Sequence, residues 1–297
     1  GNPVWHSYER KEVHAAYVFL LPICAAVVLF ILVPVLGTFW NSFFRDVSFL
    51  PRGIVGLRNY VTILTDSSFR QAAWFTVAFT AVTVALEACF GMAFAVLLSR
   101  QFAFRGVLRT VILVPWAIPT IVSAKVWKLV FQYTYGVLNY LVITTGITDT
   151  KINWLGTAAG AFWSIVIAEV WKTTPFVVII LLAGLQAIPE EVYKQAAIDG
   201  ARMFKRFRTI TLPLLRPVLV IALVFRTIDS LRIFDLVYVL TGGGPGGATT
   251  TLSVLGFEYF SNDRFGMGSA ISIITFFLAF GFTLLYVKVG RFRESLT

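Results

Sequence analysis

The sequence predicts an all-α membrane protein with six transmembrane helices. Hydrophobic residues make up 58% of the 297 residues and charged residues only 13%, whereas soluble domains carry about 25% charged residues. Six apolar runs each reach the length of about 20 residues that a helix needs to cross a bilayer. Lys and Arg concentrate in every second connection between these runs, which is typical of loops that stay in the cytoplasm.

The apolar runs place the spans along the chain. Within a transmembrane domain at 16–288, we predict spans at about 16–40, 71–98, 107–131, 160–185, 217–240 and 267–288. Residues 1–15 mix aromatic and charged side chains, which predicts a helix on the inner membrane surface, and 289–297 form a cytoplasmic tail. Pro22 and Pro34 are expected to kink the first span.

The distribution of basic residues predicts the orientation. Fourteen Lys and Arg residues fall in the segments predicted to be cytoplasmic and six in the outer connections, so both termini are predicted to lie inside. The net charge of +10 follows from this distribution. Membrane lipid is therefore the expected neighbour, and nucleic acid is not an expected partner.

Residues 189–216 are the long charged segment between two apolar runs, and we call them the cytoplasmic knob. They hold six basic residues and three acidic ones. Pro189 suits a first helical turn, and Gly200 suits a helix end or bend. Beyond it, Phe204, Phe207 and Ile210 recur on one helical face. The pattern predicts two short helices joined at a glycine.

The knob resembles a family motif. Gly200, nine residues and then I-x-L-P match the core of the EAA loop of binding-protein-dependent ABC importer permeases, and Lys194-Gln195-Ala196 stands where that family usually has E-A-A. In the family this loop is the coupling helix that enters a groove of a separate ATPase subunit, and a glutamate there pairs with a basic residue, a contact that Lys194 would change. The resemblance implies coupling roles for Glu190, Glu191, Lys194, Ala196, Asp199, Gly200, Ala201, Phe204, Ile210, Leu212 and Pro213. A connector without a partner is the alternative.

The wider chain resembles the first permease subunit of trehalose and maltose importers, notably the mycobacterial trehalose type, most closely over 167–256. That resemblance implies a second homologous permease subunit, two ATPase subunits and an extracellular or periplasmic sugar-binding protein. It places the chain in a bacterial or archaeal cytoplasmic membrane. A similar T-G-G-G-P loop in the family implies that Gly242, Gly243, Gly244 and Pro245 contact the binding protein. A flexible outer turn is the alternative for this loop.

Motifs for chemistry are missing from the sequence. There is no G-x-x-x-x-G-K-[ST] loop to hold phosphates, so we expect no cofactor in this chain and expect partner ATPase subunits to bind ATP and Mg. There is also no H-E-x-x-H, no G-x-S-x-G and no cluster of Cys and His. We assign no catalytic residue and no metal ligand, and Cys24 and Cys89 are interpreted as packing residues.

Charged residues inside the spans indicate a polar path or ion pairs, because each costs about 2.5 to 3.5 kcal/mol at a helix centre. The sequence from Arg226 to Asp235 carries charges every three residues, which predicts a charge ladder on one helix. Glu169 and Lys172 have the same spacing. Glu87 is predicted to pair with Lys125 or Lys128. Ion pairs that only fix helix packing are the alternative.

Aromatic residues point to a sugar. Sugar rings present apolar faces to Trp and hydroxyls to charged groups, although Trp also anchors helices at membrane interfaces. Trp163 is a further candidate for contact with the sugar. The predicted substrate path consists of Trp127, Glu169, Trp171, Lys172, Arg226, Asp229, Arg232 and Asp235.

These features predict the permease subunit of an ATP-driven importer that moves a disaccharide such as trehalose or maltose by alternating access. The alternative is a stand-alone secondary transporter or channel for a small polar solute, coupled to ions through Glu87, Glu169 and Asp229. An intramembrane enzyme is a third class.

Overall fold

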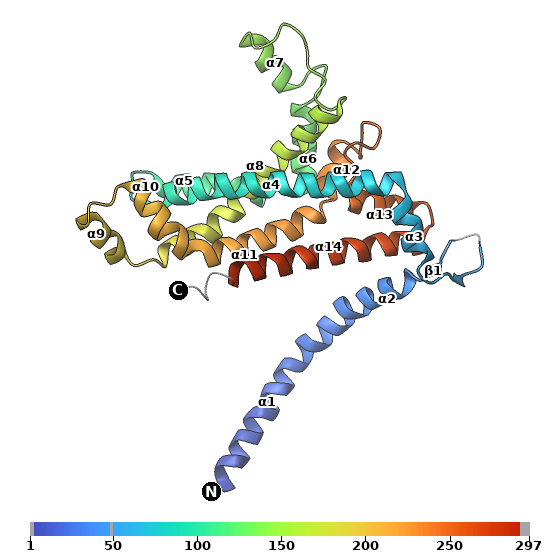
Figure 1. Cartoon of the computed structure of the whole chain (residues 1–297), viewed down its shortest axis with the longest axis horizontal. Helices are drawn as coiled ribbons and strands as arrows, with labels where there is room; N and C mark the ends of the chain where they lie inside the picture. The colour runs from blue at the N-terminus through green and yellow to red at the C-terminus, as the bar shows by residue number, and fades with distance from the viewer. Residues whose placement is uncertain (1–2, 48–49, 292–297) are drawn as a thin grey trace.

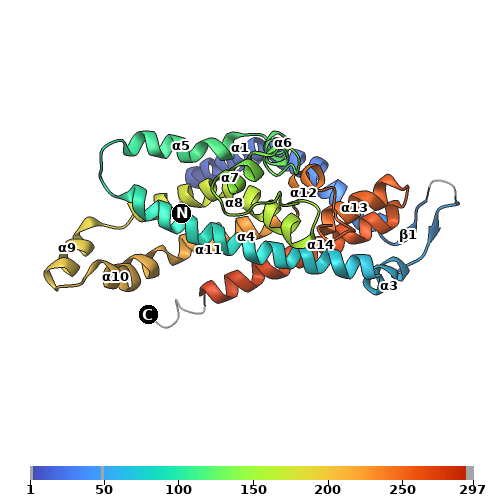
Figure 2. The same cartoon turned by 90° about the horizontal axis from the view of Figure 1, so that it is seen from above.

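The computed structural model describes residues 3–47 and 50–291, so most of the predicted tail lies outside the described residues. Four long helices form the bundle: α4 (Ser67–Ser99), α8 (Ala158–Gln186), α11 (Leu212–Leu231) and α14 (Phe265–Arg291). In Figure 1, α4, α11 and α14 run along the long axis and α8 crosses them obliquely, with the α9–α10 region at one end and α3 at the other, as Figure 2 also shows.

The bundle is held by close packing of α4 along α8 and of α11 against α4, α8 and α14. A Cβ atom on Gly91 of α4 would lie 2.5 Å from Cγ1 of Val177 on α8, so the close approach of these helices depends on glycine. Separate apolar clusters fill the bundle, one around Phe79 and Leu236 and one around Leu181 and Leu215.

The N-terminal rod leaves the bundle, as Figure 1 shows. It consists of α1 (Pro3–Val27), a π-helical turn η1 (Val28–Leu32) and α2 (Val33–Asn41), of which α2 packs against α14. Residues 3–15 are helical and continuous with the first predicted span, and their position on the membrane surface stays a prediction.

The two π-helical turns each end shortly before a proline. The N–H of Val33 donates to the carbonyl of Val28 before Pro34, and the N–H of Leu212 donates to the carbonyl of Phe207 before Pro213. A proline ring crowds the carbonyl four residues earlier and supplies no N–H, so the helix widens there instead of breaking.

The segments between the long helices form short elements. They are a hairpin of β1 (Phe44–Arg45) and β2 (Gly53–Ile54), α3 (Arg58–Thr65), α5 (Arg105–Ala117), α6 (Thr120–Val130), α7 (Val137–Thr144), α9 (Glu190–Ile198), α10 (Met203–Arg206), the π-helical turn η2 (Phe207–Thr211), α12 (Asp235–Leu240) and α13 (Leu252–Ser261). The α6–α7 region projects sideways from the bundle in Figure 1.

Five helical stretches of the described residues are long and apolar enough to cross a membrane: Ala15–Asn41, Ser67–Ser99, Ala158–Gln186, Met203–Leu231 and Phe265–Lys288. A sixth exists if α5 and α6, which meet at 94°, form one broken span. The predicted span at 107–131 corresponds to this bent pair. The predicted span at 217–240 corresponds to α11 and α12, which are separate helices. The count of six stays a prediction.

Candidate functional site

Arg226 of α11 is buried in the bundle and binds three carboxylates. Its Nε donates to Oε2 of Glu87 at 2.6 Å, its Nη2 to Oε1 of Glu169 at 2.8 Å, and its Nη1 to Oδ2 of Asp229 at 3.4 Å. Glu87 lies on α4 and Glu169 on α8, so one guanidinium joins three helices. Hydrogen-bonded ion pairs are the form in which buried charges are tolerated.

The predicted pairing of Glu87 with Lys125 or Lys128 is wrong. Glu87 accepts from Arg226 and also from the hydroxyl of Thr173 at 2.7 Å, whereas the Nζ of Lys128 donates to the carbonyl of Val239. In the sequence, Glu87 is an acid in a span that carries no cation, which indicates that its partner comes from another span. Several other spans carry a cation, so the sequence did not identify which one pairs with Glu87.

The charge ladder is shorter than predicted. Nη2 of Arg232 donates to Oδ1 of Asp229 at 2.6 Å, and the side chain of Arg232 is 70% exposed. Beyond Arg232 the helix ends, and Asp235 begins α12, so it does not continue the ladder. The ladder therefore runs from the buried Arg226 to the exposed Arg232 through Asp229.

Lys172 does not extend the Glu169 ion pair in the way the spacing suggested. Lys172 is buried, and its Nζ donates to the carbonyl of Ile118 at 2.6 Å. Ile118 lies at the bend between α5 and α6, where the backbone is extended. A break in a helix leaves carbonyl groups without their helical donors, so Lys172 stabilises the bent pair from the neighbouring α8.

The structure brings two of the predicted aromatic residues together. The rings of Trp127 and Trp171 meet edge to face with centroids 5.6 Å apart, and Trp127 also stacks on Phe131. Trp171 precedes Lys172 on α8. Trp163 lies two turns earlier on α8 and contacts Phe162. Trp127 and Trp171 thus form an aromatic pair, and Trp163 is not part of it.

The cytoplasmic knob has a defined turn at Gly200. After α9, the N–H of Ala201 donates to the carbonyl of Ala196 at 2.9 Å, and the N–H of Gly200 donates to the carbonyl of Ala197 at 3.1 Å. Gly200 has φ of 73°. These are the bonds and the left-handed residue of a Schellman helix end, which favours glycine.

The knob is attached to the bundle on one side and presents apolar side chains on the other. Tyr193 and Thr211 share a hydroxyl hydrogen bond of 3.0 Å that joins α9 to η2. Ile198 and Phe204 form an apolar tip and are 78% and 75% exposed. Met203 is 62% exposed, but its sulfur accepts from Nη2 of Arg100 at the end of α4, so it faces the bundle. The sequence analysis named Phe204 but missed Ile198, which stands out as an apolar residue next to the turn.

The other predicted coupling residues lie around this tip. Ala196 is buried, Ile210 and Ala201 are half-buried, and the exposed ones are Glu190, Glu191, Lys194, Asp199, Gly200, Leu212 and Pro213. Lys194 forms an exposed ion pair with Glu190 at 3.7 Å. A surface pair of this kind contributes little to stability, so Lys194 remains available to another partner.

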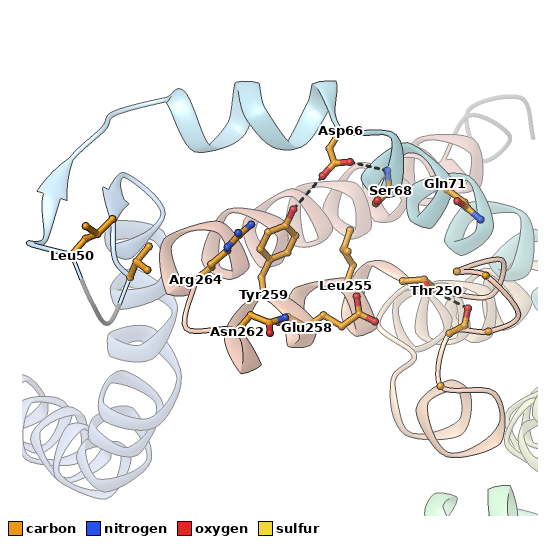
Figure 3. A pocket seen from close by; sticks show the side chains of 16 residues that line it. Leu50, Asp66, Ser68, Gln71, Thr250, Leu255, Glu258, Tyr259, Asn262 and Arg264 are labelled. Atoms are coloured by element: carbon orange, nitrogen blue, oxygen red, sulfur yellow. Dashed lines mark hydrogen bonds between the residues drawn. The ribbon is translucent and has the colours of Figure 1, made fainter.

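At the opposite end of the bundle, a cavity of about 910 Å³ is lined by the glycine-rich loop, the start of α4 and the end of α13. Figure 3 shows Asp66 between Ser68 and Tyr259. The carboxylate of Asp66 accepts from the N–H of Ser68 at 2.9 Å and from the hydroxyl of Tyr259 at 3.2 Å. Burial and the nearby Asp66 raise the pKa of Tyr259. Glu258 supplies a second, exposed carboxylate to the cavity.

The glycine-rich loop is folded rather than loose. The hydroxyl of Thr249 donates to the carbonyl of Gly244 at 2.6 Å, and Thr250 donates to the carbonyl of Gly243. Gly242, Gly243 and Gly244 line the cavity, and Pro245 belongs to the same loop without lining it. These hydrogen bonds stabilise the turn, and contact of the loop with a binding protein stays a prediction.

Comparisons with known proteins match this architecture. Residues 87–293 match the binding-protein-dependent transport system inner membrane component family. The chain is 53% identical over 295 residues to the trehalose/maltose transport system permease protein MalF of Thermococcus litoralis, with 99% of each chain covered. It is 36% identical to the trehalose transport system permease protein SugA of Mycobacterium tuberculosis, with 95% of this chain and 90% of that one covered.

A solved structure shares the fold. A chain of a bacterial alginate ABC transporter, in complex with a periplasmic protein bound to an alginate pentasaccharide, superposes with a TM-score of 0.83 at 20% identity, with 98% of each chain covered. The family match covers more than half of this chain, and the matched relatives are aligned over nearly their whole length. The chain therefore belongs to the binding-protein-dependent transport system inner membrane components.

Proposed function

We propose that this chain is the transmembrane permease subunit of an ATP-driven ABC importer that moves a disaccharide such as trehalose or maltose into the cell by alternating access. The observation that carries the proposal is the 53% identity to a trehalose/maltose permease over 99% of both chains. At that similarity and coverage the fold and the overall role are expected to be shared, and the disaccharide is taken from the relative's name.

The chain works with an ATPase through the cytoplasmic knob. Ile198 and Phe204 expose an apolar tip at one end of the bundle, and such a tip suits insertion into a groove of a partner. Two ATPase subunits, which bind ATP and Mg, engage this knob and the equivalent knob of a second homologous permease subunit. This chain itself performs no catalysis, and it binds no cofactor.

The sugar passes beside the charged residues that water reaches. Asp229 and Arg232 have side chains that are 40% and 70% exposed, whereas the side chain of Arg226 is 5% exposed. Asp229 and Arg232 therefore border the path of the sugar. The buried Arg226 pairs with Asp229 and fixes the position of its carboxylate. The aromatic pair of Trp127 and Trp171 offers ring faces to the sugar from another side.

The cavity at the α3 end faces outside and receives the sugar-binding protein at Gly242, Gly243, Gly244 and Pro245. Both the start of α1 and the end of α14 lie toward the α9 end of the long axis in Figure 1. That arrangement supports a cytoplasmic-membrane protein with both termini and the knob in the cytoplasm.

Copurification from membranes tests the assembly. We expect the wild-type chain to bring down an ATPase and a second permease, and Phe204→Asp to lose most of the ATPase, because a charge at the apolar tip must be desolvated on docking. Ile147→Asp is the matched control, since Ile147 is 74% exposed and lies in a predicted outer connection. A chain that purifies alone yet transports a polar solute would support the secondary transporter instead, which the family match does not favour.

A further inference from the structure

A cavity of about 440 Å³ lies where the end of α4 meets α9, α10 and η2. It opens to the surface between the bundle and the cytoplasmic knob, because Ser99, Arg100 and Met203 are exposed. Its polar side chains are Ser99, Arg100, Tyr193, Arg206 and Thr211. The residues that line it include two arginines and no carboxylate, so the cavity is positively charged.

The two arginines have poor partners within the chain. The Nε of Arg206 is buried and has no hydrogen-bond partner, and its side chain forms no ion pair with any described residue. The Nη2 of Arg100 points at the sulfur of Met203, which is a weak acceptor. A buried donor without an acceptor is unfavourable, so the cavity is suited to an anion that would accept from both guanidinium groups.

The remaining groups define which anion fits. Tyr193 and Thr211 use one hydroxyl proton between them, and the other proton is free to donate. A planar guanidinium binds the oxygens of phosphate with paired hydrogen bonds. Val96, Leu185 and Phe207 form an apolar side of the same cavity. The organic group of a phosphate ester would lie against this side. Basic pockets between membrane helices on the cytoplasmic side are known to bind lipid headgroups.

We propose that this cavity binds a phosphate ester, which is either the headgroup of an anionic lipid or a soluble organic phosphate. The ester would join Arg100, just after α4, to Arg206, at the start of the helical run into α11. A bound ester would therefore couple the movement of the knob more tightly to the bundle. The consequence for coupling and the cytoplasmic position of the site rest on the proposed function. The binding of the ester to the cavity does not.

The test uses the purified complex after delipidation in a neutral detergent. One arm adds phosphatidylglycerol, with phosphatidylcholine as its control, and the other adds glycerol 3-phosphate, with glycerol as its control. We expect a saturable rise in the melting temperature in at least one arm. A rise with the lipid alone identifies a headgroup, a rise with glycerol 3-phosphate alone identifies a soluble ester, and a rise in both shows that the phosphate group is sufficient.

Variants show whether the ester occupies this cavity. Arg206→Gln and Arg100→Gln should each weaken the apparent affinity by roughly tenfold or more, because each removes a charged donor. Arg208→Gln is the matched control: Arg208 lies in η2, is exposed and does not line the cavity. If Arg206→Gln does not assemble, Arg206→Lys keeps the charge without the paired donors and should bind with intermediate affinity.

Two outcomes would overturn the proposal. One is the absence of a saturable shift with either probe. The other is an equal loss of affinity in Arg208→Gln and in the two cavity variants, since that would show attraction to the general positive charge of the knob. Both outcomes can be obtained with a complex that still transports sugar, so they are distinguishable from a failure of the proposed function.

Discussion

Arg226 is the residue on which three membrane helices depend. Its guanidinium binds Glu87 on α4 and Glu169 on α8 and is 5% exposed. Replacement by Met would leave two buried carboxylates without their cation, and breaking a buried ion pair costs about 3 to 5 kcal/mol. We expect Arg226→Met to lower the melting temperature of the purified complex strongly. Arg232→Gln, on the same helix, removes an exposed cation and should change stability by less than about 1 kcal/mol. Similar losses of melting temperature in both variants would contradict the burial of Arg226 and its carboxylate partners away from water.

A variant of Asp229 distinguishes a role in helix packing from a role in sugar transport. Arg226 keeps its bonds to Glu87 and Glu169 when Asp229 loses its charge, so Asp229→Asn should leave the melting temperature nearly unchanged. If Asp229 borders the sugar path, uptake per complex should fall by roughly tenfold, the effect of losing one charged hydrogen bond. Uptake in vesicles and thermal melting are measured on the same preparation. A lowered melting temperature with preserved uptake would leave only the structural role.

At the scale of the element, the cytoplasmic knob depends on the turn at Gly200. Its φ of 73° is unfavourable for residues with a Cβ and most unfavourable for β-branched ones. A Cβ added there would have no other atom within 4 Å, so the strain is in the backbone alone. We expect Gly200→Val to insert into the membrane but to lose sugar-stimulated ATPase activity and uptake together. Gly200→Asn is the control, since Asn adopts the left-handed conformation more readily. Full activity in Gly200→Val would show that this turn is not needed for coupling.

At the scale of the whole molecule, the orientation in the membrane decides which cavity meets which partner. Ser99 lies at the end of α4 near the knob, and Ser261 lies at the end of α13 near the outer cavity; both are exposed. Single cysteines at these positions, with Cys24 and Cys89 replaced by Ser, should differ toward an impermeant maleimide in intact spheroplasts. We expect labelling at position 261, and labelling at position 99 only after permeabilisation. The reverse pattern would invert the topology and move the knob away from any cytoplasmic ATPase.

Much of the fold was predictable because it depends on local features. Apolar runs of membrane length placed the long helices, since burial in lipid requires only composition and length. Gly200 predicted the end of α9 because a left-handed residue there is a property of the backbone. Of the two kinks expected in the first span, the one at Pro34 coincides with the π-helical turn η1, whereas α1 continues through Pro22. Of the two short helices predicted for the knob, only α9 is separate, because α10 continues through η2 into α11.

The pairing of remote charges and the shapes of the cavities depended on the tertiary structure. Glu87 and Arg226 are 139 residues apart in the chain, and their own spans do not indicate which cation the acid meets. Lys172 was closer in sequence to Glu169 but bonds to Ile118, because the 94° bend between α5 and α6 brings a free carbonyl to it. Composition and local spacing determined which segments are helical and which enter the membrane. Packing of distant helices decided which side chains meet, because hydrogen bonds and ion pairs depend on distances that periodicity within one helix does not specify.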